Sequence, residues 1–198
     1  MKKDLFALAF ATSLIAGCAY QAPYGTPEAT SQLVSDLALD GVPELVVPAN
    51  WMSVPYGVTK PAEPTKGLLV SERSGLRLVI FDNKHYRQAG ELRAPKVQCG
   101  YIWRGEQDTM PVHLFEAEHF YALSLGETVG AMDVKKRAQV VRYLQSQHIP
   151  LLTVQDGLFV RATGNWSSNV PLPNNYAPWD IGVPLPRGEL EAFNPCKH

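Results

Sequence analysis

Proline restricts the fold of this chain more than any other residue, because its ring removes a backbone hydrogen-bond donor and fixes one backbone dihedral. The 198 residues contain 16 prolines, of which five lie within residues 42–64 and six lie within residues 165–198. In the first segment we expect little more than one extended piece, at residues 44–47, and beyond Gly164 we expect no regular structure. Apart from that piece, helices and strands should therefore lie before residue 42 and between residues 65 and 164.

The rest of the chain predicts an α+β domain over residues 27–164, with a small mixed or antiparallel sheet. A short helix should begin at Pro27, after the capping residue Thr26, and should stop at Gly41. The main helix is expected at residues 134–147, capped by Asp133, and its buried stripe should consist of Val134, Ala138, Val141 and Leu144. Branched and alternating residues predict strands at 76–81, 85–92, 96–103, 112–115, 119–125, 151–154 and 158–162. The first two strands should form one hairpin and the last two another.

The first residues of the chain have the layout of an export signal. Lys2 and Lys3 precede an apolar stretch over residues 5–17, and small residues stand just before Cys18. A membrane-spanning helix needs roughly 20 apolar residues, so this stretch is too short to remain as a span and should be removed by cleavage.

The end of that stretch, Leu14-Ile15-Ala16-Gly17-Cys18, resembles the lipobox of bacterial lipoproteins. The resemblance implies that residues 1–17 are a signal peptide and that Cys18 becomes the acylated first residue. Ala19 in the next position, where aspartate would imply retention in the inner membrane, implies the outer membrane. Residues 18–26 should then be a flexible tether between the lipid and the fold. The alternative is an ordinary secretory signal with an incidental cysteine.

The cysteine count predicts a disulfide. The chain has three cysteines, and if Cys18 carries lipid, Cys99 and Cys196 remain as an even pair in an oxidising compartment. We therefore predict that these two are bonded. The alternative is a reactive or metal-binding thiol, but neither cysteine has a CxxC partner or a neighbouring histidine.

Few residues suggest catalysis or cofactor binding. The one cluster of titratable groups runs from His113 to His119 and includes Glu116 and Glu118. It lacks the His-Glu-x-x-His spacing of zinc proteases, and in an extended strand its histidines would stand about 20 Å apart, so we expect no metal site. No nucleophile elbow or phosphate-binding glycine loop occurs, and we expect no cofactor. A formal charge of −1 and the lack of a basic patch argue against nucleic acid as a partner.

Large aromatic residues occur in the proline-rich segments. Trp51 and Tyr56 lie in the first segment, where they either clamp onto the domain or form part of a binding surface. The C-terminal tail, residues 165–198, should pack on the domain with Cys196 fixing its end, or else become ordered only on contact with a partner. Our candidate partner-binding residues in this tail are Trp166, Tyr176 and Trp179.

These features favour a non-enzymatic outer-membrane lipoprotein that is a structural or assembly component of an envelope-spanning machine, such as a conjugation or type IV secretion apparatus or a pilus system. The expected order strand, helix, strand, strand over residues 119–162 is similar, in order alone, to that of ring-forming modules of secretion channels. Two alternatives stay open. One is an enzyme that cuts cell-wall glycan with two carboxylic acids, and the other is a carrier of a small ligand or lipid.

Overall fold

A computed structural model describes residues 22–57, 63–103, 111–127, 132–154, 160–167 and 187–196. Three residues singled out in the sequence, Cys18, Tyr176 and Trp179, lie outside the described residues. No helix within the described ranges is both long enough and apolar enough to cross a membrane.

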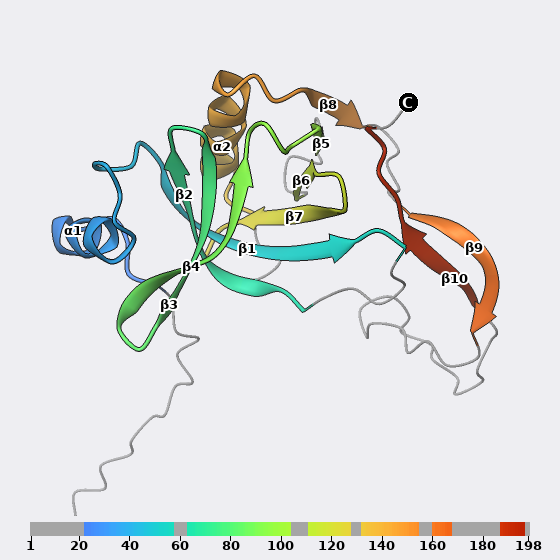
Figure 1. The fold of residues 1–198 in the computed structure, drawn as a ribbon, viewed down its shortest axis with the longest axis horizontal. Helices are drawn as coiled ribbons and strands as arrows, with labels where there is room; N and C mark the ends of the chain where they lie inside the picture. Colours follow the sequence, from blue (N-terminus) through green and yellow to red (C-terminus); the bar gives the residue numbers. More distant parts are fainter. Residues whose placement is uncertain are drawn as a thin grey trace, which may run out of the picture.

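The fold belongs to the α+β class, as predicted, and is built on an eight-stranded sheet in the order β4-β3-β2-β1-β7-β6-β5-β8 (Figure 1). Neighbouring strands are antiparallel except β5 and β8, which are parallel. The strands are β1 (Val46–Pro55), β2 (Thr65–Glu72), β3 (Gly75–Asp82), β4 (His85–Arg93), β5 (Cys99–Trp103), β6 (Val112–Phe115), β7 (His119–Leu125) and β8 (Leu151–Val154). Two further strands, β9 (Val160–Ser167) and β10 (Arg187–Ala192), form a separate antiparallel ribbon.

Two hairpins follow directly from local sequence. β3 and β4 meet in a two-residue turn at Asn83 and Lys84, whose φ angles are both positive, 49° and 67°. This is the turn geometry that suits the twist of paired strands. β6 and β7 pair Phe115 with Phe120, and Glu116 N donates to His119 O at 2.9 Å to close the turn. The predicted strands at 76–81, 85–92, 112–115 and 119–125 are thus confirmed.

The expectation for residues 42–64 is wrong, because β1 runs through them as a central strand between β2 and β7. Pro48 is tolerated in β1 because it lies opposite the position just beyond the end of β7. Its carbonyl accepts a hydrogen bond from Gly126 N at 2.9 Å, and β7 ends at Leu125. The side of Pro48 that lacks an N–H therefore faces a position with no strand residue to pair with.

Helix α2 (Val134–Ser146) covers one face of the sheet (Figure 1). Asp133 caps it as predicted, accepting from Lys135 N and Lys136 N. The predicted stripe is wrong in part, since Val134 is 48% exposed and the buried residues are Arg137, Val140, Tyr143 and Leu144. The face of α2 that carries Tyr143, rather than the face that carries Val134, packs on the sheet. The Tyr143 hydroxyl lies 2.8 Å from the carbonyl oxygen of Gly75 in β3.

The opposite face is covered in two parts. Helix α1 (Pro27–Asp36) covers the half near β4 and packs Leu33 against Leu68, Val79 and Tyr86. Thr26 caps α1 as predicted, with its Oγ1 3.2 Å from Ala29 N. The helix ends at Asp36 rather than continuing to Gly41, because the chain turns at Ala38, whose φ is 49°. The other half, over β5 to β7, is covered by residues near the C-terminus.

The structure also corrects the expected hairpin at 151–162. β8 pairs in parallel with β5, and β9 pairs with β10. Regular structure therefore continues beyond Gly164, because β9 extends to Ser167 and the segment 187–192 returns beside it.

Candidate functional site

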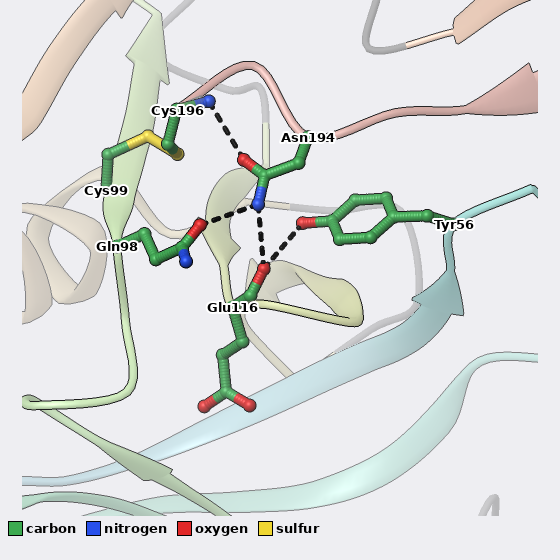
Figure 2. Close-up of a disulfide and its surroundings, with 6 residues drawn as sticks. All are labelled: Tyr56, Gln98, Cys99, Glu116, Asn194 and Cys196. Atoms are coloured by element: carbon green, nitrogen blue, oxygen red, sulfur yellow. Dashed lines mark hydrogen bonds between the residues drawn. A yellow bond between two sulfur atoms is a disulfide. The ribbon is translucent and has the colours of Figure 1, made fainter. Parts of the chain in front are cut away.

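The most distinctive junction in the described chain joins its C-terminal end to β5 and the β6–β7 turn. We call residues 191–196 the C-terminal latch. The predicted Cys99–Cys196 disulfide is confirmed, with Cα atoms 5.9 Å apart. Beside it, Asn194 Nδ2 donates to Gln98 Oε1 at 2.7 Å and to Glu116 O at 3.0 Å, while Cys196 N donates to Asn194 Oδ1 at 2.9 Å (Figure 2). One asparagine thus ties the latch to two separate segments.

The end of β1 joins the same junction. Tyr56 donates its hydroxyl hydrogen to Glu116 O at 3.0 Å, and Gly57 N donates to Ala192 O at 3.1 Å. Burial, and next the charge of Glu116, raise the pKa of Tyr56, so its hydroxyl stays protonated and remains a donor. The sequence suggested that Trp51 and Tyr56 lie in a loop, but Trp51 is in β1, 5% exposed, as part of the main core.

Beneath the latch lies a small apolar cluster of Val54, Cys99, Phe115, Phe120, Ala122 and Ala192. The rings of Phe115 and Phe120 are 5.2 Å apart between centroids. Ala192 is 5% exposed, so the latch closes over this cluster. Removing the latch would therefore expose aromatic surface to water, at a cost of roughly 25 cal/mol for each Å².

The titratable cluster at residues 113–119 spans the end of β6, a tight turn and the start of β7, so it is not one continuous strand as considered from the sequence. His113 packs beside Phe115 and Phe120, and burial lowers its pKa to about 4. Glu116 Oε2 lies 3.5 Å from His119 Nε2, and burial raises the pKa of the Glu116 carboxyl. Across the described ranges, no three His, Cys, Asp or Glu side chains gather as metal ligands do.

A second feature is an open depression of about 610 Å³ between the α1–β1 connection, the β2–β3 turn and the C-terminal end of α2. Its walls carry charge of both signs. Arg77 pairs with Glu72 and donates to Leu37 O at 2.9 Å, and Arg93 pairs with Glu91 at 2.7 Å. The remaining lining comes from residues 39–44, 71–74, Tyr143 and Gln147. A small ligand that carries both positive and negative groups would suit such walls.

Of the predicted partner-binding residues, Trp166 is the one that falls within the described ranges. Trp166 lies in β9 opposite Gly188 of β10, while Tyr176, Trp179 and the lipidation site Cys18 lie outside the described residues. Sequence reasoning missed Asn194 and the charged depression, because their neighbours come from distant segments and no local pattern marks them. No protein-family model matches the chain, and no curated protein matches it.

Proposed function

We propose that this protein is an outer-membrane lipoprotein that acts as a structural or assembly component of an envelope-spanning machine, such as a conjugation or type IV secretion apparatus or a pilus system. The lipobox-like sequence ending at Cys18 supports attachment to the membrane by a lipid anchor. The Cys99–Cys196 disulfide agrees with an oxidising compartment, where such bonds persist.

The observation that carries the assembly role is the separate β9–β10 ribbon. Among the described residues β9 and β10 pair with each other and with no strand of the eight-stranded sheet, beside which the ribbon stands (Figure 1). Its backbone bonds to the domain at its base, where Gly57 N donates to Ala192 O at 3.1 Å. A two-stranded ribbon has little stability of its own in water and needs a surface to pack against. A partner protein would supply such a surface.

The latch fixes the base of this ribbon to the domain. β10 ends at Ala192, and the next residues carry the Asn194 hydrogen bonds and the disulfide. A covalent joint at the base suits an element that transmits force or holds a fixed angle, because the ribbon cannot detach while the bond is intact.

The test is affinity purification of the tagged full chain from detergent-solubilised membranes, with Cys18→Ser and Trp166→Ala variants beside the wild type. We expect the wild type to elute with partner proteins in a large complex, and Trp166→Ala to elute alone while keeping its melting temperature. Cys18→Ser should be lost from the membrane fraction. A wild type that elutes as a monomer, with no co-purified protein, would overturn the assembly role.

A second candidate function, binding of a small ligand, is favoured by the charged depression of about 610 Å³. Its paired arginines and glutamates suit a ligand with both a carboxylate and an ammonium group. Mass spectrometry of the gently purified protein should then detect such a compound, and Arg77→Ala should lose it. Protein that carries no small molecule and shows no chemical-shift changes on addition of dipeptides would eliminate this candidate.

A further inference from the structure

We propose that the end of the fold formed by α1 and the β3–β4 hairpin lies against the phospholipid headgroups of the membrane, with Lys84 directed at anionic headgroups. The inference rests on the proposed lipidation of Cys18. It adds which surface of the domain meets the membrane and which surface points away from it.

The first step is that the chain is fixed to the domain from Ala22 onward. Ala22 is 6% exposed and belongs to the apolar cluster under α1. The carbonyl of Pro23 accepts a hydrogen bond from the Tyr86 hydroxyl at 2.7 Å. Tyr24 donates to Glu127, and Lys136 Nζ lies 3.1 Å from the Tyr24 oxygen and 5.3 Å from its ring centroid. The tether expected over residues 18–26 is therefore shorter than the sequence suggests.

The second step is the distance that remains. From Cys18 to Ala22 the chain makes four residue-to-residue steps, and fully extended it spans at most about 14 Å. The headgroup layer on each side of a bilayer is itself about 5 to 7 Å thick. An acylated Cys18 would thus hold Ala22 close to the headgroups and leave little room for the domain to turn away.

The third step identifies the surface around Ala22, which is formed by α1 and the β3–β4 hairpin. Through Tyr86 and the contacts of α1, this point is joined to the start of β4, and Gln32 of α1 donates to Lys84 O at the hairpin turn. Figure 1 places α1 and the β3–β4 hairpin at one end of the longest axis and the β9–β10 ribbon at the other. If the first end meets the membrane, the ribbon points away from it, toward partners.

The hairpin turn itself gives an independent observation. Lys84 has a φ of 67°, a left-handed conformation in which glycine is the preferred residue. Beside it, Arg87 pairs with Asp82 at 3.3 Å, and His85 Nδ1 lies 3.1 Å from Asp36 Oδ1. Within the described part of the chain Lys84 makes no ion pair, and an anionic headgroup would supply one.

The experiment uses the acylated full chain in vesicles of phosphatidylethanolamine and phosphatidylglycerol that also contain a lipid with a nitroxide on its headgroup. A fluorophore is attached at His85→Cys, where the side chain is 65% exposed, and in a matched control at Thr153→Cys, an exposed position in β8. The label at position 85 should be quenched several times more strongly than the label at position 153. Lys84→Gln should lower the ratio of docked to undocked domain about fivefold, as expected for one basic side chain near an anionic surface. In neutral vesicles Lys84→Gln should have no effect.

Lengthening the tether separates contact from chance proximity. A ten-residue Gly-Ser insertion after Gln21 should relax quenching at position 85 only partly, because the headgroup contact remains, and Lys84→Gln should then remove the rest. If the chain floats with the vesicles but positions 85 and 153 are quenched equally, the membrane-facing surface is wrong while the lipoprotein assignment stands. If the chain carries no acyl group and does not float, the proposed function itself fails, and this inference fails with it.

Discussion

The disulfide at the latch gives the sharpest stability prediction. The perturbation is the double substitution Cys99→Ala with Cys196→Ala, which removes the cross-link without leaving a free thiol at either position. The bond joins residues separated by 97 positions. In the loop-entropy treatment, closing a loop of about 100 residues removes about 4.7 kcal/mol of chain entropy from the unfolded state.

One local effect adds to that figure, and a second feature leaves it unchanged. Cys99 is 3% exposed within the apolar cluster, so replacing its sulfur with hydrogen adds a small cavity cost of about 1 kcal/mol. The Asn194 hydrogen bonds to Gln98 and Glu116 are made in both proteins, so they do not enter the difference in stability. We expect the double variant to lose about 5 to 6 kcal/mol, a large part of the 5 to 15 kcal/mol typical of a whole domain.

The assay is equilibrium unfolding in urea, followed by tryptophan fluorescence, on the protein without its lipid. The control is Asn194→Ala, which keeps the disulfide and should lose only about 1 to 2 kcal/mol. A loss below about 1 kcal/mol in the double variant, at unchanged slope, would refute the reasoning. It would mean that without the disulfide the latch is already detached in the folded variant, so that the folded state regains chain entropy as well as the unfolded one.

Two further predictions concern the sheet and its histidine. Gly67→Ala in β2 should lower the free energy of unfolding, measured in urea, by about 2 to 3 kcal/mol, because a Cβ there would lie 2.0 Å from the backbone oxygen of Val79. The control is Gly41→Ala, where a Cβ would meet no atom within 4 Å and stability should change by less than about 0.5 kcal/mol. The free energy of unfolding should fall by up to about 3 kcal/mol as the pH drops from about 6.5 toward 4, because the unfolded chain binds a proton at His113 and the folded chain does not. Unfolding of His113→Phe, measured at several pH values, should lack this loss. If its pH profile equals that of the wild type, another group is responsible.

Local elements could be predicted from sequence because their signals lie within a few residues of one another. The β3–β4 and β6–β7 hairpins and both helix caps depend on contacts between near neighbours, such as Asp133 with Lys135 N and Lys136 N. The disulfide was predictable by a different route, since cysteine pairing in an oxidising compartment needs only a count. The structure confirms that pairing.

Long-range pairing could not be predicted in the same way. Residues 151–154 and 158–162 look like a hairpin because a turn-forming sequence joins them. In the structure, α2 carries the chain from β7 to the far side of β5, where β8 adds in parallel, with Gly100 opposite Leu151. A Cβ on Gly100 would lie 2.6 Å from the Leu151 side chain, so the two strands fit closely at a glycine that stands 51 positions earlier in the sequence. The Asn194 contacts of the latch were hidden for the same reason.

The proline-rich strand β1 shows what a count of blocked donors omits. In an antiparallel strand, successive residues direct their backbone groups to alternate neighbours. Pro48 and Tyr56 both bond toward β7, through Gly126 N and Glu118 O, so Pro55 faces the β2 side. There the pairing with β2 ends at Trp51 and Thr65. Each proline thus turns its blocked nitrogen toward the neighbour that has already ended. Proline excludes a central strand only when its nitrogen faces a neighbouring strand that continues past it. Where each neighbouring strand ends is set by distant parts of the chain.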